Sequence, residues 1–248
     1  METAERQLVN ILGVNVDRIS MSEALDRLEK FISQQTPRLV ATANAEMVMV
    51  AQSDPELRFI LNSSDMVLPD GAGVVWAARR LGSGVPERVA GYDLTQKFLA
   101  RAATKGYRVF WLGAAPGIAA EAAAHAKKLY PGLLTAGIRD GYFSPVEEAS
   151  VVKSISECRP DILLCALGVP KQEQWLFKQL AALQTPVVIG VGGTFDVMAG
   201  RVRRAPLWMQ NAGLEWSYRL MRQPSRFFRM LALPRFVVRI LWSAWTTG

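Results

Sequence analysis

A carboxylate follows a short apolar run in the stretch Leu68–Gly73, and its place suggests acid–base chemistry. The run Met66–Leu68 has the composition of a buried strand, and Pro69, which cannot donate to a sheet ladder, is expected to end it. Asp70 then stands on a glycine-containing turn into a helix predicted over 74–81. A carboxylate there would lie in the crevice where open α/β sheets bind ligands, but aspartate is also among the commonest helix N-caps. From this stretch alone, a catalytic role and a capping role both stay open.

The elements that must position such a group alternate along the chain. Helices are predicted from Ser22, after a cap at Asn44 and from Pro55, and amphipathic helices separate apolar strands in the second half. This alternation is typical of a parallel sheet covered on both faces. The expected strands cover 9–16 (a strand or hairpin), 38–42, 66–68, 108–112, 133–138, 161–167 and 186–191. We expect an α/β fold, a Rossmann-like, mostly parallel sheet with helices on both faces, and a C-terminal basic helical appendage.

Basic and aromatic residues are concentrated at the C-terminal end. Residues 201–248 hold nine arginines, one acid and four of the seven tryptophans, whereas the preceding residues are close to neutral. We therefore predict a catalytic domain over 1–195 and an appendage over 196–248. Arginine with aromatic residues suits a phosphate-rich partner with an apolar neighbour, which a membrane surface or a nucleic acid could both supply. No secretory signal and no transmembrane helix are expected, so the protein should be cytoplasmic.

Small, polar or glycine-containing segments follow the predicted strands, at 42–44, 70–71, 113–117, 139–142, 168–172 and 192–196. Backbone N–H groups from such segments would converge on one crevice, which favours a phosphate-bearing ligand such as a nucleotide. Neither a G-x-G-x-x-G nor a Walker fingerprint occurs, which counts against a nicotinamide oxidoreductase and a P-loop NTPase. With no D-x-D pair and one mid-helix histidine, His125, we expect no metal, no cofactor and no histidine-based triad.

Seven short motifs together carry a family resemblance. They are Thr42-x-Asn44-x-Glu46, Leu68-Pro69-Asp70-Gly71-x-Gly73, Pro86-Glu87-Arg88-Val89-x-Gly91-x-Asp93, Gly168-x-Pro170-x-Gln172-Glu173, Gly192-Gly193-x-Phe195-Asp196, Arg203-x-Ala205-Pro206 and Gly213-Leu214-Glu215-Trp216-x-x-Arg219. In this order they resemble the WecG/TagA/CpsF family of bacterial glycosyltransferases, most of all its TagA branch of wall teichoic acid synthesis. The resemblance implies metal-independent, inverting transfer of N-acetylmannosamine (ManNAc) from UDP to the C4 hydroxyl of GlcNAc on undecaprenyl diphosphate. Other donors occur in the family, among them UDP-ManNAc uronic acid and UDP-glucose.

The resemblance also implies roles for the matching residues. Asp70 would be the general base that takes the proton from the acceptor hydroxyl. Thr42, Asn44 and Gln172 would hydrogen-bond the sugar or position that base. Arg88 would stabilise the charge of the departing diphosphate.

Four residues are expected at the nucleotide. Asp196 matches a position that binds the uridine ribose, Tyr142 would pack on uracil, and Gly113 and Gly193 belong to glycine turns at the strand ends. Two further acids of the motifs, Glu46 and Glu173, are expected to be structural caps or surface acids.

The resemblance also implies that the appendage folds over the active site at the cytoplasmic face of the membrane and meets the diphosphate of the acceptor. Arg219, Arg226 and Arg229 are spaced as one helix face, which Arg222 would share. The expected partners are then the UDP-sugar, the lipid-linked acceptor and an anionic membrane, but not nucleic acid, and a homo-oligomer stays open. The competing class is a nucleic-acid- or membrane-binding protein without catalysis.

Overall fold

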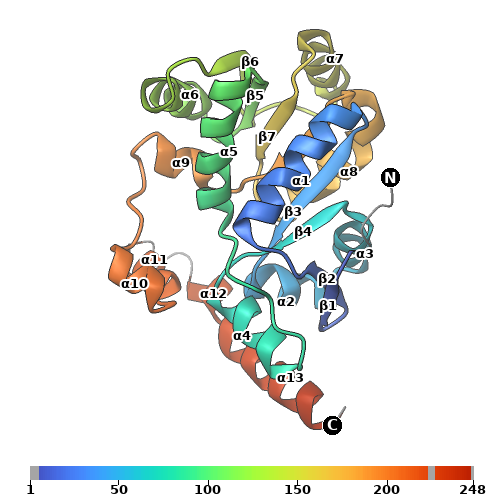
Figure 1. The fold of residues 1–248 in the computed structure, drawn as a ribbon, viewed down its shortest axis with the longest axis vertical. Coiled ribbons are helices and arrows are strands. Elements are labelled where there is room, and N and C mark those ends of the chain that lie inside the picture. The colour runs from blue at the N-terminus through green and yellow to red at the C-terminus, as the bar shows by residue number, and fades with distance from the viewer. Residues whose placement is uncertain (1–5, 223–226, 247–248) are drawn as a thin grey trace.

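A six-stranded, all-parallel sheet forms the centre of the structure, a computed structural model that describes residues 6–222 and 227–246, with only the backbone for 211, 219 and 228. The strand order is β4-β3-β8-β7-β5-β6, and β1 and β2 form a separate antiparallel hairpin (Figure 1). The strands are β1 (Leu8–Ile11), β2 (Val14–Asp17), β3 (Arg38–Ala43), β4 (Met66–Pro69), β5 (Arg108–Gly113), β6 (Leu134–Arg139), β7 (Ile162–Ala166) and β8 (Val187–Gly190). The α/β class, the parallel sheet and the opening hairpin are confirmed.

Helices cover both faces of this sheet. They are α1 (Met21–Gln34), α2 (Ala45–Ser53), α3 (Pro55–Ser63), α4 (Ala72–Arg80), α5 (Gly91–Lys105), α6 (Ile118–Leu129), α7 (Glu148–Cys158), α8 (Lys171–Leu183), α9 (Thr194–Met198), α10 (Leu207–Asn211), α11 (Glu215–Arg222), α12 (Phe227–Met230) and α13 (Ala232–Thr246). Successive strand residues point to opposite faces, so Ile189 packs among residues of α1, α5, α6 and α9, and Val188 among residues of α3, α7 and α8. The edge strand β6 departs from the expected coverage, because Leu134 and Ile138 are exposed.

Side-chain caps set several helix starts. Asn44 Oδ1 accepts a hydrogen bond from Met47 N (2.9 Å) at the start of α2, and Asp54 caps α3, whose first residue is proline. Both starts are confirmed. The predicted cap of α1 was wrong by two residues, because Ser20, not Ser22, forms a reciprocal capping box with Glu23.

The capping role considered for Asp70 is also wrong. Asp70 N donates to Ala43 O (2.9 Å), so the pairing between β3 and β4 extends through this residue. Gly71 then takes the N-cap position of α4 with a φ of 92°, and no side-chain hydrogen bond caps the helix. A positive φ of this kind favours glycine. Gly71, and not Asp70, is therefore the N-cap residue of α4, which begins at Ala72 and not at 74.

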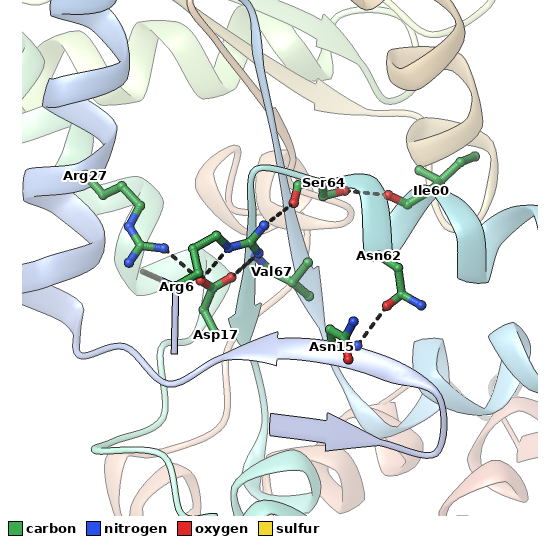
Figure 2. A network of polar contacts seen from close by, with 8 residues as sticks. All are labelled: Arg6, Asn15, Asp17, Arg27, Ile60, Asn62, Ser64 and Val67. Atoms are coloured by element: carbon green, nitrogen blue, oxygen red, sulfur yellow. Dashed lines mark hydrogen bonds and ion pairs between the residues drawn. The ribbon is translucent and has the colours of Figure 1, made fainter. Parts of the chain in front are cut away.

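A buried carboxylate joins the hairpin to the strand that leads to Asp70 (Figure 2). Asp17, at the end of β2, is 1% exposed, and its two oxygens accept hydrogen bonds from the Arg6 guanidinium (3.0 and 2.6 Å), from Arg27 Nη1 (2.7 Å) and from Val67 N (2.7 Å). Arg6 Nη1 also donates to Ser64 O (2.7 Å). Both oxygens of the buried charge are thus paired, as a buried carboxylate requires. The network holds β4 three residues before Asp70.

The C-terminal helices lie beyond the ends of β3 and β4, next to α4 (Figure 1). Phe236 and Ile240 of α13 are 1% and 0% exposed and pack in one core with residues of α2 and α4. The other face of α13 exposes apolar side chains, with Val238, Trp242 and Trp245 at 65%, 66% and 82%. Among the described residues, no helix has the length and apolar character needed to cross a bilayer.

Candidate active site

Four strand ends meet around one polar cavity of about 380 Å³. Thr42 comes from β3, Asp70 from the end of β4, Gly168 from the turn after β7 and Gly192 from the turn after β8. The carboxyl ends of parallel strands lie at the same edge of the sheet, so these four segments, far apart in sequence, become neighbours. We call this space the first cavity.

A second cavity of about 570 Å³ shares Asp70, Asn44 and Glu46 with the first. Its other walls come from α4, from the loop before α5 and from the C-terminal helices, and they are largely apolar: Ala45, Gly71, Ala72, Gly73, Trp76, Arg88, Gly213, Glu215, Trp216, Met230, Leu233, Pro234, Phe236 and Val237. Asp70 therefore stands on the wall of both spaces. A group held in the first cavity and a group held in the second would both lie next to this carboxylate.

Close packing surrounds the Asp70 carboxylate. A Cβ atom at Gly91, the first residue of α5, would lie 3.1 Å from Thr42 Cγ2 and 3.5 Å from Asp70 Oδ2. Glycine at this position lets α5 begin directly beside both side chains. Asn44 lies on the walls of both cavities, but its Oδ1 is used as the cap of α2, which leaves the amide N–H groups to face a ligand.

Gln172 ties two loops of the first cavity together. Its side chain is 1% exposed, and its Oε1 accepts hydrogen bonds from Gly168 N (3.3 Å) and Gly192 N (3.1 Å). Its Nε2 donates to Glu173 Oε1 (2.7 Å). Gln172 thus fixes the relative place of the turns after β7 and β8, and direct contact with a sugar stays a prediction.

The two glutamates that were expected to be structural caps or surface acids do neither. Glu173 is 1% exposed, burial raises the pKa of its carboxyl to about 7, and its Oε2 has no hydrogen-bond partner among the described residues. Glu46 lies on the walls of both cavities, and its Oε1 is 2.5 Å from Arg229 Nε of α12. The place of Glu46 two residues after Asn44, in the same motif, was a sequence signal that it lines the site.

Of the residues predicted at the nucleotide, Asp196 and Gly193 line the first cavity. Tyr142 is 73% exposed and lines a third cavity, of about 560 Å³, together with Phe143 and Lys171. This third cavity lies at the ends of β5, β6 and β7, next to the turn after β7, so the three cavities follow one another along the carboxyl edge of the sheet.

Gly113 has a structural reason to be glycine. It ends β5 with a φ of 120°, and a Cβ atom there would lie 2.6 Å from the backbone of Ala166 in the neighbouring strand β7. Its nucleotide-binding role stays a prediction, because close strand packing explains the residue type without a ligand.

Arginines and acids form a network beside the second cavity. Arg88 lies 3.8 Å from Glu215 of α11 and 4.0 Å from Asp93 of α5. Arg204 makes two hydrogen bonds to the same Asp93, at 2.6 and 3.2 Å, and its guanidinium lies 4.5 Å from the centre of the Tyr92 ring. Arg204 has no role predicted from the sequence, although it stands inside the motif Arg203-x-Ala205-Pro206.

Of the four arginines predicted to meet the acceptor, Arg219 and Arg222 lie in α11 and Arg229 lies in α12. The single face predicted through Arg219, Arg226 and Arg229 stays a prediction, because it passes through residues 223–226, which lie outside the described residues. Arg229 reaches the first cavity, whereas Arg222 is exposed and lies 5.9 Å from the Tyr218 ring. Arg226 lies outside the described residues, as does the side chain of Arg219.

No group of three or more His, Cys, Asp or Glu side chains within the described ranges is arranged to hold a metal ion. His125 is an exposed residue of α6, as predicted. The site thus consists of carboxylate, amide, hydroxyl and guanidinium groups that line two adjoining cavities. Such a set can hold a phosphate-bearing ligand and remove a proton from a second ligand beside it.

Comparison with known proteins agrees with this arrangement. The chain is similar to proteins named N-acetylglucosaminyldiphosphoundecaprenol N-acetyl-beta-D-mannosaminyltransferase from three bacteria. Identity is 38% with that of Bacillus spizizenii (85% of this chain, 81% of the relative), 36% with that of Bacillus subtilis (90% and 86%) and 31% with that of Staphylococcus aureus (96% and 94%). The model of the glycosyl transferase WecG/TagA/CpsF family matches residues 9–248, and the chain belongs to this family of enzymes.

Proposed function

We propose that the protein transfers ManNAc from UDP-ManNAc to the C4 hydroxyl of GlcNAc-diphospho-undecaprenol, forming a β-1,4 linkage. In this proposal the configuration at the anomeric carbon inverts and no metal ion takes part. The reaction is an early step in the synthesis of wall teichoic acid or a related surface polymer. The names of the relatives support the acceptor and the transferred sugar. The related alternative keeps the same acceptor with another donor, such as UDP-ManNAc uronic acid or UDP-glucose.

The position of Asp70 between two unlike cavities carries the proposal. The first cavity is polar and holds Asp196 and Gly193, which suits a sugar nucleotide. The second is mostly apolar and is closed by the C-terminal helices, which suits the sugar end of a lipid-linked acceptor. In a transferase of this kind, the donor and the acceptor must both lie next to the catalytic base, and Asp70 lines both cavities.

The chemistry proposed at this point is a single displacement. The Asp70 carboxylate accepts the proton of the acceptor hydroxyl while the hydroxyl oxygen attacks the anomeric carbon of the donor. The bond from that carbon to the diphosphate breaks, its electron pair stays on the diphosphate, and the configuration inverts because attack and departure occur on opposite faces. Thr42 and Asn44 would orient the sugars, and Gln172 would keep the donor loops in place. Arg88 keeps its proposed role at the departing diphosphate.

The nucleotide would extend along the carboxyl edge of the sheet. Its ribose is proposed to lie at Asp196, with Gly193 alongside, and its uracil at the exposed ring of Tyr142 in the third cavity. The turn at Gly113 joins these places. The adjacency of the first and third cavities supports this order.

The C-terminal segment, proposed as an appendage over 196–248, would meet the acceptor and the membrane. Arg229 on the wall of the first cavity, with Arg219, Arg222 and Arg226, would receive the acceptor diphosphate. Exposed Trp242 and other apolar side chains of α13 would enter the interfacial layer at the cytoplasmic face of an anionic membrane. A homo-oligomer also stays a prediction.

A donor panel tests the proposal most directly. The protein is assayed with UDP-ManNAc, UDP-ManNAc uronic acid and UDP-glucose on a lipid-diphosphate GlcNAc acceptor. We expect turnover with UDP-ManNAc, and Asp70→Asn should lower kcat by about 10²- to 10⁴-fold while the Kd for UDP stays unchanged. The matched control is Asp26→Asn, an exposed aspartate of α1 that pairs with Arg101 away from the site. Full turnover by Asp70→Asn would remove Asp70 as the base.

A further inference from the structure

We propose that Arg203 binds the diphosphate of the nucleotide donor and stabilises the charge left on it when the sugar departs. This inference rests on the proposed function and assigns a residue to which the sequence analysis gave no role. Arg203 lines the first cavity together with Gly193 and Asp196, the two residues proposed to lie beside the nucleotide.

The backbone before Arg203 is fixed against the helix that carries Asp196. Arg201 N and Val202 N both donate hydrogen bonds to Asp196 O, at 2.9 and 3.1 Å. The chain therefore folds back over α9 and delivers residue 203 to the cavity wall immediately after these two bonds. The side chain of Arg201 points the other way, to Glu121 of α6, with its Nε and Nη2 at 3.0 and 2.5 Å from the carboxylate oxygens.

The other two arginines on this wall already have carboxylate partners. Arg204 makes two hydrogen bonds to Asp93, and Arg229 lies 2.5 Å from Glu46. For Arg203, which is exposed, no ion pair is found within the described ranges. Of the three arginines lining the first cavity, Arg203 is thus the one whose charge is left for a ligand.

A diphosphate in this cavity needs such a cation. Asp70 and Asp196 line the same cavity, and Glu46 there is paired with Arg229, so an anionic ligand needs a cation that is not already paired with a carboxylate. Charge on the diphosphate grows as the bond to the sugar breaks, and a fixed guanidinium beside it lowers the energy of that state. Arginine also presents paired N–H groups that match phosphate oxygens. Arg88, also proposed to stabilise this charge, lines the second cavity near Glu215 and Asp93, so Arg203 would act together with it from the first cavity.

Calorimetric titration of the full chain with UDP, UMP and uridine tests this assignment. For Arg203→Gln we expect the Kd for UDP to rise by roughly ten- to a hundredfold, because a hydrogen bond to a charged group is lost. The Kd for uridine should not change, and UMP should show a smaller loss than UDP. Arg203→Lys, which keeps the charge, should fall between Gln and the wild type. In steady state, Arg203→Gln should also lower kcat, since the stabilised charge grows during the reaction.

The matched control is Arg201→Gln, which removes a guanidinium two residues away in the same segment and should bind UDP as the wild type does. A wild-type chain that fails to bind UDP overturns the proposed function and this assignment with it. A wild type that binds UDP, with an Arg203→Gln variant that binds it equally well, overturns the assignment alone. An equal loss of UDP and uridine affinity also overturns it, because that result points to local distortion and not to a phosphate contact.

Discussion

The two cavities that meet at Asp70 are built in different ways. The first is formed mainly by turns directly after four strands of one sheet, and buried hydrogen bonds of Gln172 hold two of those turns; residues 202–204 and Arg229 complete its wall. The second has one wall from α4 and another from C-terminal helices that are attached through side chains such as Phe236 and Ile240. The first thus rests mainly on the sheet, and the second depends on the docking of α13. Changes to the packing of α13 should therefore affect the acceptor more than the nucleotide.

The largest expected effect comes from Phe236→Ala. Phe236 is 1% exposed and fills the contact of α13 with α2 and α4, so its loss should cost about 3–5 kcal/mol of the packing free energy of that segment. We expect acceptor turnover to fall strongly while the Kd for UDP, measured by calorimetry, stays near that of the wild type. Trp242→Ala on the exposed face of the same helix serves as the packing control in detergent-solubilised assays. A parallel loss of UDP binding by Phe236→Ala would contradict the separation of the two cavities.

A second expected effect concerns Glu173, whose carboxylate accepts a hydrogen bond from Gln172 of the first cavity. Burial raises the pKa of Glu173 from its ordinary value of 4.5 to about 7, so the folded state binds this proton more tightly than the unfolded state does. The contribution of Glu173 to the free energy of unfolding is then fully present below about pH 4.5. It decreases as the pH rises toward 7 and is lost above pH 7. Glu173→Gln removes the titration and keeps an acceptor for Gln172. Its unfolding free energy relative to the wild type should therefore increase between pH 4.5 and 8 by up to about 3 kcal/mol.

Chemical denaturation at several pH values measures this difference. Glu157→Gln provides the control, because Glu157 is an exposed acid of α7 that pairs with Lys153. A stability difference between Glu173→Gln and the wild type that does not change with pH would contradict the raised pKa.

The smallest expected effect concerns the contact that joins the two cavities. Glu46 holds Arg229 where both cavities meet, but Arg229 is half exposed, so Glu46→Gln should change global stability by less than about 1 kcal/mol. Release of Arg229 should raise the KM for the acceptor by roughly fivefold, because an arginine no longer held at the cavity pays an ordering cost on binding. Steady-state kinetics with varied acceptor checks this. The related change Glu56→Gln, on the exposed surface of α3, should leave the KM unchanged.

Local signals predicted much of the fold. The cap at Asn44 and the proline start of α3 were found because a helix N-terminus depends on a few adjacent residues. The predicted capping role of Asp70 was wrong because its backbone N–H pairs with Ala43 of a neighbouring strand. Residue spacing within the segment cannot reveal such a contact between strands. The arginine face predicted through Arg226 stays a prediction, because it runs through residues that the structure does not describe.

Many residues of the candidate site were predicted from the sequence, but few of the contacts between them were. Residues at strand ends, such as Thr42 and Asp196, were found because parallel strands gather their carboxyl ends. The contact of Glu46 with Arg229 joins residues 183 positions apart, and no periodicity connects them. Burial of Glu173 was missed for a related reason, because a glutamate in the first turn of a helix has the sequence pattern of a solvated acid.

The Asp17 network has a consequence for the amino end of the chain. Strand β4 is at the edge of the sheet, and an edge strand exposes N–H groups on which another chain can pair. Asp17 accepts a hydrogen bond from one of these groups, Val67 N, and Arg6 ties the segment before the hairpin to Ser64 O, at the end of α3 two residues before the same strand. The hairpin therefore acts as a cover against intermolecular sheet growth. Truncation or fusion near Arg6 should therefore disturb β4, the strand that leads to Asp70, because Arg6 contacts Ser64 O across 58 positions of sequence.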